Sequence, residues 1–418
     1  ILTQNPLNHF ARFETYLWES SKKNKNHFLE LIRNEMPQET FLELAIWYYN
    51  IGRKDDAIKL LKLAPQNAEI SYWLAFLTGE PLDCSKLDPN FVFPFRQETA
   101  EILKQLLHNN DCWLLNYHLA LIHWNLNNIP KANHYFSQCG NTPNYPPFYA
   151  ARAEFSSRYK IIELNTLSDL KHAIELDHIQ WRYGRQLAEY YLSEQKFKEA
   201  LSVVEQYFNR SPGNYYLGLL YAKILLKNKL FVEANKVLSN IQVLPNEGAT
   251  EGRKLYKETQ LMLALFEMKK SNYRKALEYI ELAKYWPENL GVGKPYDNDI
   301  DERLEDWLAY KCYIELENKE DAQQILDRIM SFKPQKTAYI NTFSSVNNLV
   351  TAWAMQQTGK EDAAETFLQN WSEKEPHNSL VTWVINVFKG MDFHFQDEEK
   401  MDENYRILDA YIKLKNQN

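Results

Sequence analysis

Cysteine is scarce in this chain. Its 418 residues include four cysteines, Cys84, Cys112, Cys139 and Cys312, and none of them forms a CxxC pair. This density is far too low for a disulfide scaffold. The sequence therefore indicates a reducing compartment or buried structural thiols, and it gives no zinc-ligand spacing.

Glycine and proline are also few, with 12 and 16 residues respectively. Tyr, Phe, Leu, Ala, Lys and Glu are plentiful, a composition that favours long helices with aromatic packing over a turn-rich β fold. No stretch approaches the roughly 18 consecutive apolar residues that a membrane-spanning helix needs. We therefore predict an all-α chain without insertion into a membrane.

Positive charge is not in excess, because the formal net charge is −7. No basic stripe is present that could neutralise a phosphate backbone, so nucleic acid is not the expected partner. The chain begins at Ile1 without a basic segment followed by an apolar one. A signal peptide or an upstream domain is therefore expected to have been removed, and a cytoplasmic location is slightly favoured over a periplasmic one.

A pattern of small and large residues recurs along the chain. A small residue is followed three positions later by a large one, then by alanine after nine more positions, and then by an apolar residue. The copies centre on Ala45/Ala57, Ala120/Ala132, Ala188/Ala200, Ala222/Ala234, Ala264/Ala276, Tyr310/Ala322 and Ala352/Ala364. Small residues at these positions let two helices approach closely, so we expect Ala188, Ala200, Ala222 and Ala234 to be nearly fully buried.

This pattern resembles the tetratricopeptide repeat, whose period is about 34 residues, and Ala200 and Ala234 lie one period apart. The resemblance implies an all-α solenoid, a right-handed superhelix of antiparallel helix hairpins that each depend on their neighbours for stability. We expect N-terminal capping helices in residues 1–39, the hairpin array in 40–391, and a C-terminal capping helix in 392–418.

Helix patterns at the two ends support these caps. At the start, Asn5 and Pro6 suit a helix N-terminus ahead of the apolar stripe Phe10, Phe13 and Leu17. At the end, one helical stripe consists of Met401, Tyr405, Leu408, Tyr411 and Ile412, and the opposite side carries Glu403, Asn404, Asp409 and Lys413.

Three proline-rich segments are long for hairpin connections: 81–95, 140–148 and 286–300. The helix count places the first within one hairpin and the other two between hairpins. We expect the last two to share an edge. The phenylalanines of 91–95 and the aromatic residues of 145–148 either fill gaps between helices or provide a stacking surface for a sugar.

The segment 286–300 carries the strongest signals. Its Gly293-Lys294 pair lacks the earlier glycine and the following hydroxyl residue of a phosphate loop. Its alternating Asp297, Asp299 and Asp301 lack the glycine and glutamate of a calcium loop, so a solvated acidic helix N-terminus is favoured. We expect Trp286 and Leu290 to anchor the segment. Its outward side chains, Asn289, Lys294, Tyr296 and Asp299, would form part of a docking surface.

This segment and residues 5–14 also resemble parts of the helical-repeat portion of large bacterial proteins that carry an upstream, carbohydrate-related β-sandwich domain. The resemblance implies an alternative function, in which the chain is the accessory region of a carbohydrate-active protein whose catalytic domain lies upstream.

No motif for catalysis or for a cofactor is present. HExxH and GxSxG are absent, and His118 and His123 are five residues apart, so they do not face one ligand on a helix. We therefore predict a non-enzymatic scaffold without a cofactor, which binds a protein, a peptide or an upstream domain.

The best candidates for partner contact lie on the first helix of each hairpin, opposite its packed stripe, because first helices line the groove of such a solenoid. These residues are Arg182, Arg185, Glu189, Tyr216, Lys223 and Lys227. The resemblance also suggests a clamp for a C-terminal carboxylate, but Leu42 and Ile46 occupy its positions in the first clear repeat.

Overall fold

The computed structural model describes residues 1–246, 249–333, 342–391 and 401–416. Within these ranges the regular elements are α-helices and short 3-10 turns, without a strand. The all-α prediction is confirmed. The domain limit predicted at residue 392 lies outside the described residues, as does part of the segment 392–418.

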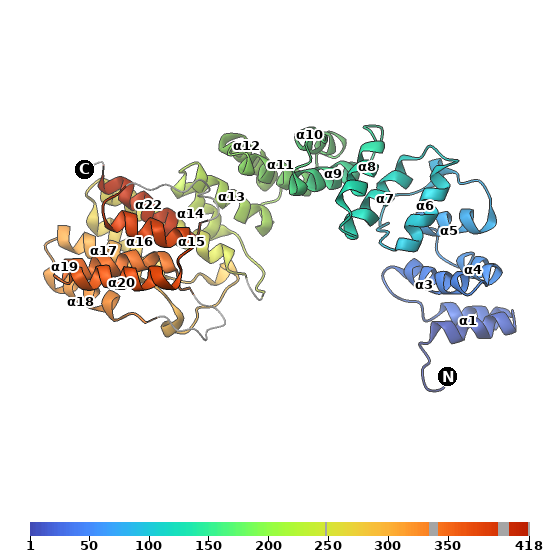
Figure 1. Cartoon of the computed structure of the whole chain (residues 1–418), viewed down its shortest axis with the longest axis horizontal. Helices are drawn as coiled ribbons and strands as arrows, with labels where there is room; N and C mark the ends of the chain where they lie inside the picture. The colour runs from blue at the N-terminus through green and yellow to red at the C-terminus, as the bar shows by residue number, and fades with distance from the viewer. Residues whose placement is uncertain (247–248, 334–341, 392–400, 417–418) are drawn as a thin grey trace. The chain divides into compact units, whose positions relative to one another are not determined.

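The chain divides into two compact units, residues 1–179 and 180–418. Most of their α-helices are labelled in Figure 1. The first unit contains α1 (His9–Trp18), α2 (Lys22–Leu29), α3 (Pro37–Asn50), α4 (Lys54–Leu61), α5 (Ala68–Thr78), η1 (Cys84–Lys86), α6 (Gln97–Leu107), α7 (Trp113–Asn125), α8 (Ile129–Gln138), α9 (Pro146–Tyr159) and α10 (Thr166–Leu176). The second unit begins with α11 (Trp181–Ser193), α12 (Phe197–Arg210), α13 (Tyr215–Lys227), α14 (Phe231–Asn240), α15 (Glu251–Lys269) and α16 (Tyr273–Lys284). It continues with η2 (Glu288–Leu290), η3 (Asp297–Asp299), α17 (Arg303–Glu315), α18 (Lys319–Ser331), η4 (Ser345–Asn347), α19 (Asn348–Gln357), α20 (Glu361–Lys374), α21 (Ser379–Phe388) and α22 (Glu403–Lys415).

Consecutive helices pair as hairpins, and the first helices of successive hairpins in the second unit also contact one another. The small positions of the repeat lie at the closest helix contacts. Ala188, Ala200, Ala222 and Ala234 are fully buried, which confirms the predicted register. Two glycines of the same helices were missed by the pattern: a Cβ on Gly184 would meet the Tyr207 ring, and one on Gly218 would meet Ile241.

Seven hairpin turns in the described chain share one geometry. In each, the second residue after the first helix has a left-handed backbone: Gly52, Asn127, Gln195, Lys229, Ser271, Glu317 and Gly359. The next backbone N–H donates to a carbonyl in the last turn of the first helix, for example Lys196 to Tyr191 at 2.8 Å. This arrangement satisfies carbonyls that the helix end would otherwise leave unpaired. The spacing from Tyr310 to Glu317 equals the spacing from Ala188 to Gln195. Tyr310 therefore occupies the position that alanine holds in the other hairpins.

The N-terminal helix starts later than predicted. Asn8, not Asn5, is the N-cap of α1, and its side chain accepts a hydrogen bond from the Ala11 N–H at 2.9 Å. The segment 140–148 is shorter than predicted, because Pro146 and Pro147 occupy the first turn of α9, where a missing N–H costs nothing. Residues 81–95 connect α5 and α6 of one hairpin, as predicted.

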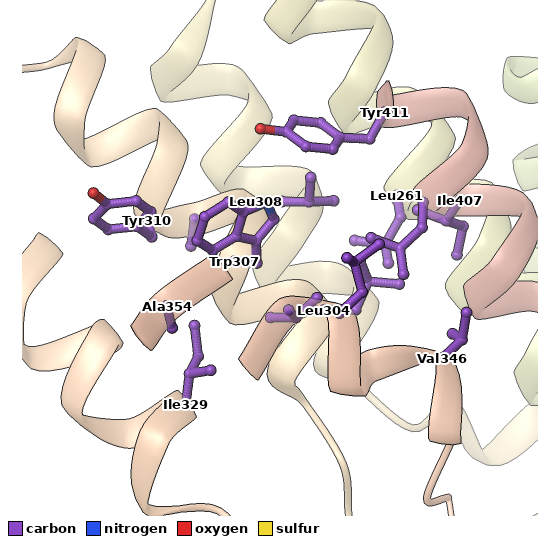
Figure 2. Packing of buried hydrophobic residues seen from close by; sticks show 14 of the residues in the cluster. Leu261, Leu304, Trp307, Leu308, Tyr310, Ile329, Val346, Ala354, Ile407 and Tyr411 are labelled. Atoms are coloured by element: carbon purple, nitrogen blue, oxygen red, sulfur yellow. The ribbon is translucent and has the colours of Figure 1, made fainter. Parts of the chain in front are cut away.

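The C-terminal segment forms the predicted helix, α22, but its buried residues are not all the predicted ones. Asn404 is buried and Ile407 belongs to the core, whereas the sequence pattern placed Asn404 on the exposed side and omitted Ile407. Figure 2 shows Ile407 beside Leu261 of α15, and Tyr411 close to Trp307 of α17. The helix thus packs against α15, the first helix of its hairpin. Its role as an end cap stays a prediction.

Candidate binding pocket of the C-terminal unit

Five of the six predicted groove residues lie around one pocket in the second unit. Its volume is about 1080 Å³, and Arg185, Glu189, Tyr216, Lys223 and Lys227 line it. They come from α11 and α13, and residues of α15 line the pocket beside α13. We call this the α13–α22 pocket. Arg182 is not part of its lining; its guanidinium lies 4.7 Å from the centre of the Trp181 ring.

The opposite wall of the pocket consists of α22, which sequence reasoning did not place there. Its lining residues are Met401, Asp402, Glu403, Tyr405, Arg406, Asp409 and Ala410. The repeat period identified the first helices because the same pattern recurs in each hairpin. A single terminal helix carries an amphipathic pattern but no signal for the surface it covers.

The floor of the pocket is apolar, with leucines on three successive first helices: Leu192 on α11, Leu219, Leu220 and Leu226 on α13, and Leu255 on α15. Tyr216 is 52% exposed at the rim, and its ring stacks on the Trp181 ring with centres 6.2 Å apart. An apolar floor with an aromatic residue at its edge is typical of sites that bind side chains of a polypeptide.

Both sides of the pocket carry charges of both signs, because Glu189, Glu251 and Glu258 line it from α11 and α15 and Arg406 lines it from α22. Lys223, Lys227 and Lys229 line the pocket from α13 and the turn after it, and Lys254 adds a further cation from α15. Asp402, Glu403 and Asp409 line it from α22. Arg185 is paired with Glu189 at 3.1 Å.

The segment 286–300 is anchored as predicted at two residues. Leu290 is fully buried and Trp286 is almost so. Gly291 has a left-handed backbone, and a Cβ there would meet Val243 at 3.0 Å. The Val243 N–H donates to the Asn289 carbonyl at 2.8 Å. The segment therefore packs closely against the chain that follows α14.

Asn289 does not point outward, so this part of the prediction is wrong. Its Nδ2 donates to the carbonyls of Leu238 and Ile241 at 2.9 and 2.8 Å, at the C-terminal end of α14. An amide that satisfies two helix-end carbonyls has a structural role. Lys294 and Tyr296 are exposed and Asp299 is half-buried; Lys294 pairs with Asp297 at 2.8 Å.

The prediction of a solvated acidic helix start is wrong for Asp301, which is buried. Burial opposes its charge, but the Arg303 guanidinium at 2.8 Å outweighs this cost and keeps the pKa of Asp301 below its usual value. Asn347 also donates to the same carboxylate. No group of three or more potential metal ligands occurs in the described ranges.

The two aromatic loops of the first unit touch one another, since the Tyr145 hydroxyl donates to the Pro89 carbonyl at 3.3 Å. Phe91, Phe93 and Phe95 are exposed, whereas Phe148 is fully buried beside Trp113 and Tyr117. The gap-filling interpretation therefore holds for Phe148. The edge predicted to join 140–148 and 286–300 involves both units and stays a prediction.

His118 illustrates the state of the buried histidines. It is completely enclosed, its Nδ1 lies 3.0 Å from the Tyr72 hydroxyl, and burial lowers its pKa to about 3. The ring is therefore neutral at physiological pH. Among the described helices none is long and apolar enough to cross a membrane.

Comparison of the chain with known proteins gave matches among solved structures. No family model matches it, and no curated protein matches it. Among solved structures, the C-terminal part of a TPR repeat-containing protein from Cytophaga hutchinsonii is 13% identical, with 58% of this chain and 92% of that chain covered and a TM-score of 0.43. A tetratricopeptide repeat protein from Parabacteroides merdae is 9% identical, with coverages of 84% and 98% and a TM-score of 0.29. PilW, described as a type IV pilus biogenesis factor, is 12% identical, with coverages of 53% and 94% and a TM-score of 0.32.

The hairpins are tetratricopeptide-like. Their alanine pairs are buried, their turns repeat one geometry, and successive first helices contact one another. The tetratricopeptide-like array places α11, α13 and α15 side by side, and it thereby brings residues of three hairpins to one pocket.

Proposed function

We propose that this chain is a non-enzymatic scaffold and that the α13–α22 pocket binds a polypeptide segment of a partner. The observation that carries the proposal is the convergence of Arg185, Glu189, Tyr216, Lys223 and Lys227 on one pocket with an apolar floor. They were selected from the repeat pattern alone.

A polypeptide fits the chemistry of the pocket better than a compact small molecule does. The leucine floor favours apolar side chains that recur along a chain, while the lysines of α13 and the acids of α22 favour charges of opposite sign along its two sides. Exposed charges contribute modestly to affinity, about 0.2–1 kcal/mol each, so the apolar contacts would supply most of the binding energy.

Selection from a phage-displayed library of random 16-residue peptides tests this function on the full chain. The unmodified protein should enrich amphipathic peptides, and K223E/K227E should bind them on the order of tenfold more weakly. The matched control is K198E/K319E, which reverses two exposed lysines on second helices outside the pocket. Equal loss of binding in both double variants, or no enrichment at all, would refute the proposal.

Residues of the segment 286–300 form a second part of the proposal. Lys294, Tyr296 and Asp299 are proposed to contact a docked domain or partner, because they lie on a segment that is fixed by Leu290 and Gly291. Arg182 is proposed as an accessory contact beside the pocket. Attachment of an upstream β-sandwich domain stays a prediction.

A further inference from the structure

The C-terminal helix α22 contacts the same surface that forms the pocket. The Arg406 guanidinium on α22 forms two hydrogen bonds with Glu258 of α15, at 2.7 and 2.5 Å. The Tyr411 ring lies 6.1 Å from the Trp353 ring of α19, and the Tyr405 ring lies 4.8 Å from the Trp383 ring of α21. One helix thus lies across first helices of several successive hairpins.

The interface under α22 has an apolar centre. Tyr405, Ile407, Leu408 and Tyr411 are buried there, against a core that includes Trp307, Leu308 and Leu261 (Figure 2). Burial of such apolar side chains stabilises the contact and holds α22 on this face. This spacing of apolar residues is the recognition pattern of a helix that lies in a groove.

Polar groups lie next to this apolar centre, and they reduce the net stability of the contact between α22 and the hairpins. Asn404 is buried, and its Oδ1 has no hydrogen-bond partner within the described chain. The Arg406–Glu258 pair is largely removed from water, so much of its attraction offsets the cost of desolvation. The contact is therefore specific in its charge pairing but weaker than an all-apolar core contact of similar size.

We infer that the face formed by α15, α17, α19 and α21 is a helix-binding site whose resident ligand is α22. The site goes beyond the peptide-binding pocket. The two share Glu258, Tyr405 and Arg406, whereas Ile407, Leu408 and Tyr411 lie outside the pocket lining. The site binds an amphipathic helix of a defined pattern. An aromatic residue is followed directly by an arginine, the second residue after the arginine is a leucine, and a second aromatic residue lies about one helical turn after the leucine. In this chain these are Tyr405, Arg406, Leu408 and Tyr411.

A synthetic, fluorescein-labelled peptide of residues 401–416 serves as the probe, with the full chain as receptor. The attached α22 competes at an effective concentration of about millimolar, so the peptide should not bind the unmodified chain at micromolar concentrations. R406E places a carboxylate against Glu258 and weakens the attached helix. Fluorescence anisotropy should then show at least about tenfold tighter peptide binding than to the unmodified chain.

A reciprocal exchange provides the control for charge specificity. E258R/R406E restores an opposite-charge pair within the chain. It also sets the guanidinium introduced at position 258 against Arg406 of the peptide, so peptide binding should be lost again. Equal binding of the peptide to all three proteins would overturn the inference, because the peptide would then occupy another surface. No binding by an R406E chain that melts like the unmodified protein would also overturn it.

Hydrogen exchange on the unmodified chain gives a second test that needs no variant. If α22 is a ligand of this face, its amides should exchange through a local opening, faster than those in the middle of α15. Protection of α22 equal to that of α15 at all denaturant concentrations would show that the helix leaves only on global unfolding, and would contradict the inference.

Discussion

At the scale of single residues, the side chains of the segment 286–300 divide into structural and exposed ones. Asn289 satisfies two carbonyls at the end of α14, whereas Tyr296 is 84% exposed and Lys294 forms a surface ion pair with Asp297. The sequence places all three in one polar run. It could not reveal this division, because the partners of Asn289 lie about 50 positions earlier in the chain.

This division predicts different stability effects. Asn289→Ala should lower the free energy of unfolding by about 1–3 kcal/mol, because two buried carbonyls lose their donor. Lys294→Ala and Tyr296→Ala should change it by less than about 0.5 kcal/mol. Urea unfolding followed by circular dichroism measures both effects. A larger loss for Tyr296→Ala than for Asn289→Ala would contradict this division.

Glu69 on α5 links stability of the first unit to pH. It is buried, Thr99 donates to it at 2.8 Å, and burial raises its pKa to about 7 from 4.5. The unfolded chain loses this proton near pH 4.5 and the folded chain only near pH 7. Stability attributable to Glu69 therefore falls as the pH rises between these values and stays low above them.

Glu69→Gln should remove this dependence. At pH 8 the variant should be more stable than the unmodified chain by about 3 kcal/mol, and at about pH 4.5 the difference should be small. Glu98→Gln, on the exposed side of α6, is the matched control. An equal effect of Glu69→Gln at the two pH values in urea unfolding would contradict the assigned protonation.

At the scale of elements, the repeated turn explains why the hairpins have a uniform geometry. The left-handed residue lies at the same place in seven turns of the described chain, but it is a glycine only in two, Gly52 and Gly359. A side chain in this backbone conformation costs roughly 1–2 kcal/mol. Glycine is a turn signal that a sequence displays at Gly52 and Gly359, whereas Gln195, Lys229 and Glu317 carry no such signal.

Substitutions at this position should therefore have opposite signs. Ser271→Gly should raise the free energy of unfolding by about 1 kcal/mol, and Gly359→Ser should lower it by a similar amount. No atom lies within 4 Å of a Cβ added at Gly359, so the effect there comes from the backbone alone. Thermal melts of the two variants measure the shift in melting temperature. Shifts of the same sign in both variants would refute this explanation.

The helices themselves were largely predictable, because the alternation of small and large residues fixes which sides meet. Ala188 with Ala200 and Ala222 with Ala234 identified two hairpins and their register. The surface beneath α22 was not predictable. Periodicity identifies the apolar side of α22, but its partners on α15, α19 and α21 depend on the path of the chain between Phe388 and Glu403.

At the scale of the whole molecule, the proposed binding site belongs to the C-terminal unit. Its first helices contribute most of the lysines and the leucine floor of the α13–α22 pocket, and α22 contributes the opposite wall with Glu403, Arg406 and Asp409. Repetition is what produces the site, since equivalent positions of successive hairpins lie next to each other. The residues of α11 and α13 were therefore predictable from the sequence, and those of α22 were not.

Site-specific crosslinking tests this central claim most directly. A photoreactive benzoylphenylalanine is placed at Tyr216 on the pocket rim or at Val232, which is exposed on α14 and outside the pocket lining. A library-selected peptide should crosslink to the first position and not to the second, and K223E/K227E should reduce the yield on the order of tenfold. Equal crosslinking at the two positions, or a yield unaffected by the two charge reversals, would contradict a peptide-binding pocket between α13 and α22.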